Sequence, residues 1–150
     1  MNHEDTAVEL YRKHRPKSFK AVIGQQEAIG QLRTMLAEER LPHALLFNGL
    51  SGCGKTTLAR ILAEKLECSN PFEINAAESR GIDTVRDAID KQNMAVIGGN
   101  KSRIWIWDEC HKLTGDAQTA MLKMVEDIPS YVYHFLCTTD PQKLLPTIRS

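Results

Sequence analysis

The residues best suited to chemistry lie between positions 49 and 56, where the chain reads Gly-Leu-Ser-Gly-Cys-Gly-Lys-Thr. Three glycines in so short a run let main-chain N–H groups wrap closely around an anion. Lys55 adds a positive charge for the outer phosphates of a nucleotide, and the Thr56 hydroxyl can hold Mg²⁺. The pattern GxxxxGK[ST] is therefore typical of a phosphate-binding loop. The residues expected to contact a bound nucleotide here are Gly49, Ser51, Gly52, Cys53, Gly54, Lys55, Thr56 and Thr57.

The flanking sequence favours a binding loop over an ordinary glycine-rich turn, which is the alternative. An apolar run over residues 44–47 precedes the loop, as a buried strand would. Apolar residues follow at helical spacing at Leu58, Ile61, Leu62 and Leu66. Strand, loop and helix in this order are what such a site requires. Cys53 lies near the expected helix start, where a thiol can be activated, but we favour the plainer interpretation that its side chain points away from the phosphates.

A pair of carboxylates follows the strongly apolar run Ile104-Trp105-Ile106-Trp107. The carboxyl ends of parallel strands border the crevice where ligands bind in such sheets. Asp108 is predicted to orient Mg²⁺ through water, as the acidic partner of Thr56, and Glu109 to polarise a water for attack on the terminal phosphate. The alternative is that both acids only end a strand at the surface. The phosphate-loop pattern in the same chain argues against this alternative. Thr139 ends a further strand, where the spacing is equally compatible with a functional role and with an ordinary turn.

Strands alternate with helices along the chain, which predicts parallel βαβ units and a three-layer α/β fold. Besides 44–47, strands are expected over 72–75, 104–107 and 131–137. A first helix is expected to bury Ala28, Ile29, Leu32, Met35 and Leu36, and one from about Asp83 to carry Val85 and Ile89 inward. Thr114 is expected to be the N-cap of a helix that Pro129 stops. That helix is expected to bury Ala117, Met121, Met124, Val125 and Ile128.

Size and composition are those of one soluble globular domain, with 150 residues, 42% hydrophobic and 25% charged. Lys plus Arg and Asp plus Glu number 19 each, so DNA would have to be bound by a local surface or by several subunits together. No signal peptide or membrane span is expected. The four cysteines lack CxxC spacing, which argues against zinc and disulfides and favours a reducing cytoplasm.

Several segments follow one another in a familiar order: Tyr11 to Pro16, Val22 to Gln25, Gly49 to Thr56, Arg80 to Arg86, Asp108 to His111 and Thr138 to Pro141. In this order they resemble the AAA+ clamp-loader ATPases, most of all the bacterial DNA polymerase III gamma/tau subunits and next the small subunits of replication factor C. The resemblance runs from about residue 9 to the end of the chain. It implies one AAA+ core domain over residues 1–150, a P-loop NTPase with a parallel sheet that uses ATP and Mg²⁺.

The resemblance also implies roles that spacing does not show. The arm over residues 1–20 and the segment after it would lie against the adenine and ribose. By composition alone, this basic stretch would be a solvated arm or a phosphate clamp. Thr139 aligns with the sensor position at the terminal phosphate and joins Lys55 and Glu109 in the catalytic set, whereas His111 is common in the family and is expected to be structural. The residues implied to contact adenine and ribose are Arg12, Arg15, Pro16, Val22 and Ile23.

Two departures from the family pattern matter. Bacterial relatives usually carry a cysteine-rich zinc module after the position of Cys68, which stands alone here, so zinc is not expected. Family members continue after the serine at Ser150 with Arg-Cys, whose arginine is a finger that completes a neighbour's ATP site. Arg149 precedes that serine, whereas the finger of the family follows it, so Arg149 is not assigned this role. The chain is therefore expected to be truncated before the finger, the last strand and the helical lid.

The resemblance implies an ATP-binding and hydrolysing subunit of a DNA sliding-clamp loader. Such a subunit would act in replication with other loader subunits, the sliding clamp and primed DNA, and would hydrolyse ATP slowly without a neighbour's finger. The alternative is an ATP-binding structural or regulatory module without useful turnover, against which the intact Lys55, Thr56, Asp108 and Glu109 argue. A helicase interpretation of Asp-Glu-Cys-His is disfavoured, because the chain is too short for two motor domains.

Overall fold

The computed structural model describes residues 21–23, 28–48, 52–94 and 99–149. Within these ranges the strands form one parallel sheet, in the order β1-β2-β5-β4-β3. The strands are β1 (Ala21–Ile23), β2 (Ala44–Asn48), β3 (Phe72–Asn75), β4 (Arg103–Asp108) and β5 (Val132–Thr138). The helices are α2 (Ala28–Ala37), α3 (Gly52–Lys65), α4 (Ile82–Gln92), α5 (Gly115–Val125) and α6 (Pro146–Arg149), with short 3-10 helices η1 (Cys110–Lys112) and η2 (Pro141–Lys143).

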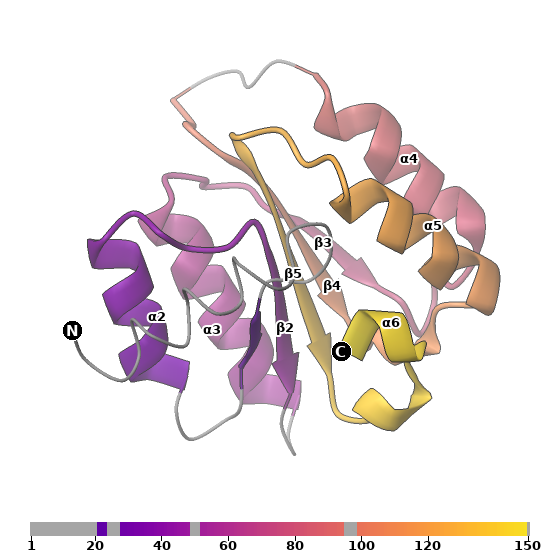
Figure 1. The fold of residues 1–150 in the computed structure, drawn as a ribbon. Helices are drawn as coiled ribbons and strands as arrows, with labels where there is room; N and C mark the ends of the chain where they lie inside the picture. The colour runs from indigo at the N-terminus through magenta and orange to yellow at the C-terminus, as the bar shows by residue number, and fades with distance from the viewer. Residues whose placement is uncertain (1–20, 24–27, 49–51, 95–98, 150) are drawn as a thin grey trace.

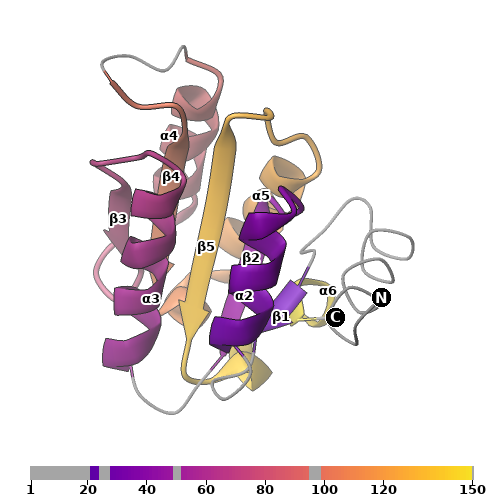
Figure 2. The same ribbon diagram turned by 90° about the vertical axis from the view of Figure 1, so that its left-hand side faces the viewer.

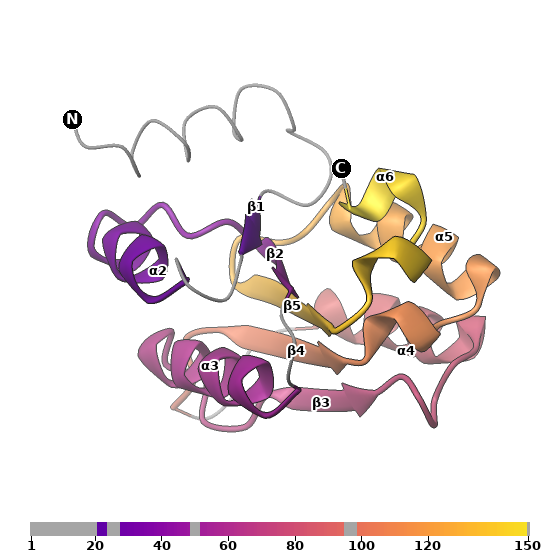
Figure 3. The same ribbon diagram turned by 90° about the horizontal axis from the view of Figure 1, so that it is seen from below.

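Helices cover both faces of the sheet (Figures 1 and 3). Helices α2 and α3 lie side by side on one face (Figure 2), where their buried residues pack with Leu45 and Ile106. Helices α4, α5 and α6 cover the other face and pack with Leu46 and Trp105. Because side chains alternate along a strand, each central strand contributes to both cores. The predicted three-layer α/β fold with a parallel sheet is confirmed.

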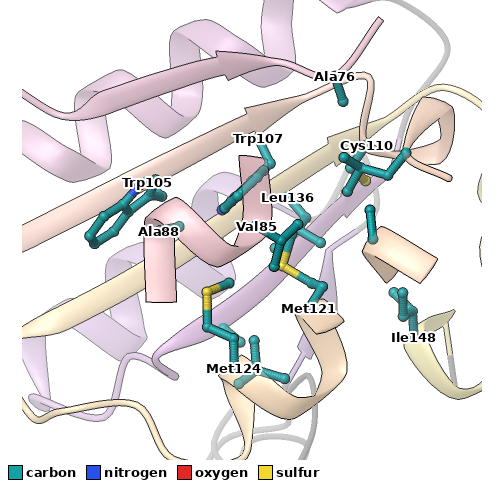
Figure 4. Close-up of a cluster of buried hydrophobic side chains, with 14 of the residues drawn as sticks. Ala76, Val85, Ala88, Trp105, Trp107, Cys110, Met121, Met124, Leu136 and Ile148 are labelled. Atoms are coloured by element: carbon teal, nitrogen blue, oxygen red, sulfur yellow. The ribbon is translucent and has the colours of Figure 1, made fainter. Parts of the chain in front are cut away.

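Two tryptophans of β4 fill the core under α4 and α5 (Figure 4). Trp105 and Trp107 are 1% and 0% exposed, and they share a cluster with Val85 of α4 and Met121 of α5. Large aromatic side chains bury on the order of 200 Å² each. The packing therefore holds β4, the strand that ends in Asp108, firmly between its neighbours.

The sequence did not predict β1. This strand pairs with β2 at the edge of the sheet, with Val22 opposite Leu46. Three residues are too few for a recognisable alternation of apolar and polar side chains.

Helix α5 begins as predicted but ends earlier. The Thr114 hydroxyl accepts a hydrogen bond from the main-chain N–H of Ala117 at 3.2 Å, which confirms the N-cap. The helix ends at Val125, so Ile128 packs against the core from the following turn rather than from the helix. The prediction that the helix continues to Pro129 is therefore wrong.

The buried face of α3 also differs from its prediction. Ile61 is 48% exposed, although the spacing of the apolar residues placed it inside. The small residues Ala59 and Ala63 share the buried face with Leu62 instead. Alanines carry a weak apolar signal, yet they allow a helix to lie close to a sheet. In the described ranges no helix has the length and apolarity that a membrane crossing requires.

His134 is a fully buried polar residue in the middle of β5. The indole Nε1 of Trp107 lies 3.1 Å from the His134 Nδ1, and the His134 Nε2 lies 3.1 Å from Oε1 of Gln92 in α4. An indole N–H can only donate, so Nδ1 accepts and the neutral ring donates from Nε2 to Gln92. Burial lowers the pKa of His134 from 6.5 to about 3.

The neutral His134 ring predicts a loss of stability in mild acid. Above pH 6.5 the ring is neutral in both the folded and the unfolded chain. As the pH falls toward about 3, only the unfolded chain takes up the proton, so this residue lowers the free energy of unfolding by up to about 1.4 kcal/mol per pH unit. In His134→Phe, which cannot titrate, urea unfolding followed by tryptophan fluorescence should show a shallower pH dependence. Equal slopes in the two proteins would contradict the assignment.

Candidate nucleotide-binding site

The register of the sheet aligns the carboxyl ends of β2, β4 and β5 along one edge of the sheet, the edge that runs across the strands (Figure 1). Phe47 of β2 pairs with Cys137 of β5, and Trp107 of β4 pairs with Leu136 of β5. Asp108, the residue after Trp107, therefore lies level with the end of β2. The chain leaves β2 at this edge and enters α3, so the start of α3 and Asp108 border the same edge of the sheet.

The phosphate-loop residues precede and open α3. Gly49 and Ser51 lie outside the described residues. The stretch from Gly52 to Lys55 forms the first turn of α3, but the structure describes only its main chain. Thr56 is half-buried and Thr57 is exposed. A helix of 14 residues presents unpaired N–H groups and a positive dipole end at its start, both of which favour a phosphate.

The residues implied to contact adenine fall largely outside the described ranges. Arg12, Arg15 and Pro16 all lie there. Val22 and Ile23 belong to β1, of which only the main chain is described. Their contact with a nucleotide base stays a prediction.

Asp108 is half-buried at the end of β4. Ile104 and Ile106, four and two positions before it, face the core under α3, so strand alternation places Asp108 on the α3 face. Its Oδ1 accepts a hydrogen bond from the N–H of Glu109 at 3.1 Å, which orients the carboxylate. Carboxylate and hydroxyl oxygens suit Mg²⁺, so the types of Asp108 and Thr56 fit this ion, and their joint role as its ligands stays a prediction.

Glu109 has a left-handed backbone conformation, with φ 54° and ψ 43°. Such a conformation costs a non-glycine residue about 1 kcal/mol. It allows the chain to turn sharply from β4 into η1, where the N–H of Lys112 donates to the Glu109 carbonyl at 2.9 Å. The Glu109 side chain is 29% exposed at this turn, so its carboxylate is accessible to solvent but partly held by protein.

The two threonines at the end of β5 have different surroundings. Thr138 is fully buried, and its hydroxyl oxygen accepts a hydrogen bond from the N–H of Asp140 at 3.0 Å. Thr139, the predicted sensor residue, is exposed. Of the two hydroxyls, only that of Thr139 is open to a ligand.

One contact of the site was missed by sequence reasoning. His111 was expected to be structural. Its Nδ1 lies 2.8 Å from the Thr138 hydroxyl oxygen, and its Nε2 lies 3.6 Å from Glu109 Oε2. Strand alternation could have shown that Thr138 and Thr139 face opposite sides of the sheet. The contact with His111 depends on the turn at Glu109, for which the sequence gives no signal.

An ion pair joins α3 to β3, an outer strand of the sheet. The Arg60 guanidinium donates to both carboxylate oxygens of Glu73 in β3, with Nη2 2.6 Å from Oε1 and Nε 3.0 Å from Oε2. These hydrogen bonds, and then the charge of Glu73, raise the pKa of Arg60. Because the pair is exposed, its contribution is orientation of α3 more than stability.

A hollow of about 540 Å³ at the other end of α3 is a weaker candidate for a nucleotide. Glu64 and Glu67 line it, together with Cys68 and Asn100. The two carboxylates would repel a triphosphate, and the charge of Lys101 is already paired with Glu67 at 3.4 Å. The edge formed by Asp108 and the start of α3 therefore suits a nucleotide better.

The fold defines a class, the P-loop NTPase fold of the AAA+ type. Solved structures agree with that class. A gamma subunit-related protein of DNA polymerase III from Thermotoga maritima matches with a TM-score of 0.68 and 28% identity, over 79% of this chain and 43% of that chain. A RuvB structure from Thermotoga maritima matches with a TM-score of 0.60 over 83% of this chain and 42% of that one, and at 22% identity it shows the fold alone.

Sequence comparison shows the family. The family described as "DNA polymerase III, delta subunit" matches residues 24–79 and 74–150, so the chain belongs to this clamp-loader ATPase family. It is 38% identical to DNA polymerase III subunit gamma/tau of Mycobacterium bovis and 35% identical to the tau subunit of Escherichia coli, over 94% of the chain in both cases. The chain spans 28% and 25% of the length of these relatives. The resemblance inferred from the motifs is confirmed.

The left-handed conformation of Glu109 predicts an unusual order of stability among substitutions. At an ordinary position alanine is more stable than glycine, whereas glycine avoids the strain of positive φ. We expect Glu109→Gly to exceed Glu109→Ala by about 1 kcal/mol in free energy of unfolding, measured by urea denaturation. Glu126, with φ −69°, is the matched control and should show the opposite order. If both positions favour alanine, the turn at Glu109 is not as described.

Proposed function

We propose that this chain is the ATP-binding and ATP-hydrolysing part of a sliding-clamp loader subunit in DNA replication. The observation that carries the proposal is the register of β2, β4 and β5, which aligns the ends of these strands, and with them Asp108, at one edge of the sheet. Membership of the clamp-loader family supports the same conclusion. The fold alone would not, because P-loop folds serve many reactions.

Each group at the edge has a task in this proposal. The N–H groups at the start of α3 and Lys55 hold the phosphates, while Thr56 and Asp108 hold Mg²⁺. Mg²⁺ held there would supply positive charge that offsets the charge of the phosphate oxygens. Glu109 accepts a proton from the attacking water, and the exposed hydroxyl of Thr139 orients that water or the terminal phosphate.

Completion of the site by a neighbouring subunit explains why turnover by one copy should be slow. In the family an arginine finger reaches the ATP site from the next subunit. Such a finger is worth about 10³–10⁵ in rate, or roughly 4–7 kcal/mol of barrier. Nucleotide binding and assembly are thereby coupled, since hydrolysis becomes fast only where two subunits meet.

The proposed partners follow from the same reasoning: other loader subunits, the sliding clamp and primed DNA, in the cytoplasm. Single basic residues make poor candidates for DNA contacts here. Lys91 pairs with Asp87 at 3.1 Å, and Arg86 with Asp83 at 3.6 Å. DNA bound by several subunits together would be weakened only modestly, and for all sequences alike, when one such charge is removed.

Glu109→Gln separates binding from hydrolysis. Glutamine keeps the size of glutamate but cannot accept the proton, so the single-turnover hydrolysis rate should fall by about 10²–10⁴ while the affinity for Mg-ATP stays within a few-fold of that of the unchanged chain. Lys55→Ala should lose binding itself, as measured by isothermal titration calorimetry. Fast hydrolysis by a verified monomer, comparable to that of an assembled loader, would refute the need for a neighbour.

The same variant distinguishes the ATPase from the alternative function, an ATP-binding structural or regulatory module. If the chain were an ATP-binding structural module without useful turnover, a loader reconstituted with Glu109→Gln would load clamps as well as the unchanged one. A loss of clamp loading with retained ATP binding and assembly supports the ATPase.

A further inference from the structure

His111 connects the proposed catalytic base to the end of the neighbouring strand. Its Nδ1 lies 2.8 Å from the hydroxyl of Thr138 in β5, and its Nε2 lies 3.6 Å from Oε2 of Glu109. The imidazole is 4% exposed, so solvent contributes little to its orientation. One ring therefore contacts both the turn after β4 and the last residue of β5.

The hydrogen bonds of Thr138 determine which nitrogen of His111 carries the proton. The buried hydroxyl oxygen already accepts from the N–H of Asp140 at 3.0 Å. Its own hydrogen needs an acceptor, because buried polar groups are satisfied with few exceptions, and Nδ1 is the nitrogen within reach. When the ring carries a single proton, that proton is then on Nε2, the nitrogen that lies 3.6 Å from Glu109 Oε2.

Two contacts then act on Glu109. Its main-chain N–H donates to Asp108 Oδ1 at 3.1 Å, and its carboxylate Oε2 lies 3.6 Å from Nε2 of His111, a close polar contact that is longer than a hydrogen bond. A base works only when its carboxylate is aimed at the water it must activate, and small misplacements are costly. The left-handed turn alone fixes the backbone of Glu109 but not its side chain.

We propose that His111 and Thr138 are positioning residues, which hold the Glu109 carboxylate for hydrolysis and tie it to the strand end that carries Thr139. The proposal rests on the ATPase function proposed above. Thr139 lies between Thr138 and Asp140, whose hydrogen bond closes the turn around it. A ligand that moves Thr139 would therefore also act on the base through the contact between Thr138 and His111.

Thr138→Val tests the proposal, because it replaces the hydroxyl with a methyl group of similar size. We expect the single-turnover hydrolysis rate to fall by about 10- to 100-fold while the affinity for Mg-ATP stays within a few-fold. Thr138→Ser, which keeps the hydroxyl, should restore most of the rate. Thr119→Val is the matched control. Thr119 is exposed, and its hydroxyl donates within α5 to the Gly115 carbonyl. The hydrolysis rate of this variant should equal that of the unchanged chain.

Two results would overturn the positioning role. Thr138→Val could hydrolyse ATP as the unchanged chain does, or Thr138→Ser could lose as much rate as Thr138→Val. Thermal unfolding of each variant separates a rate effect from loss of folded protein. A loss of rate confined to unfolded material would also count against the proposal.

A second measurement does not depend on hydrolysis, so it holds even if the ATPase proposal fails. Imidazole nitrogen chemical shifts in the isotope-labelled chain report which nitrogen of His111 carries the proton. We expect Nε2–H, with the Nδ1 signal shifted by Thr138→Val and the Nε2 signal shifted by Glu109→Gln. A ring that is protonated on Nδ1 alone, or that responds to neither substitution, would show that the contacts do not form in solution.

Discussion

The parallel register of three neighbouring strands is the constraint on which the site depends. Phe47 pairs with Cys137 and Trp107 with Leu136, so β2, β5 and β4 all end at the same edge of the sheet. A shift of one residue would turn Asp108 to the opposite face, away from α3. Such a shift would also drive the large side chains of β4 into the wrong core, so the packing that stabilises the sheet selects the register that assembles the site.

Both faces of the sheet contribute to this arrangement in different ways. The α3 face presents the start of the helix and Asp108, the groups that suit a phosphate and its metal ion. The α5 face is buried, with His134 hydrogen-bonded in its middle and Thr138 contacting His111 at its end. Because these buried polar groups are hydrogen-bonded to one another, they have few alternative partners, which limits movement of the groups at the end of the sheet.

Much of this could be predicted from residue types and spacing. The phosphate-loop pattern between an apolar run and a helical repeat predicted strand β2 and helix α3. The acids after the apolar run of β4 predicted the other half of the candidate site, and their role stays a prediction. Local signals failed where tertiary packing decides the outcome. Ile61 is exposed because alanines fit closer to the sheet, α5 ends at Val125, and the backbone turn at Glu109 follows from its surroundings rather than from its residue type. The contact between His111 and Thr138 joins residues far apart in sequence, which no local pattern reveals.

The central claim is that one metal-bound nucleotide contacts both the start of α3 and the end of β4. Mn²⁺ can replace Mg²⁺ in the nucleotide complex, and its unpaired electrons broaden the resonances of nearby nuclei. The most direct test is to titrate the isotope-labelled chain with Mn-ATP and follow its amide resonances. We predict that broadening begins together at Thr56, Asp108 and Thr139 and is weaker at Glu64 and Glu67. Broadening centred on Glu64 and Glu67, or at Asp108 without Thr56, would contradict the account.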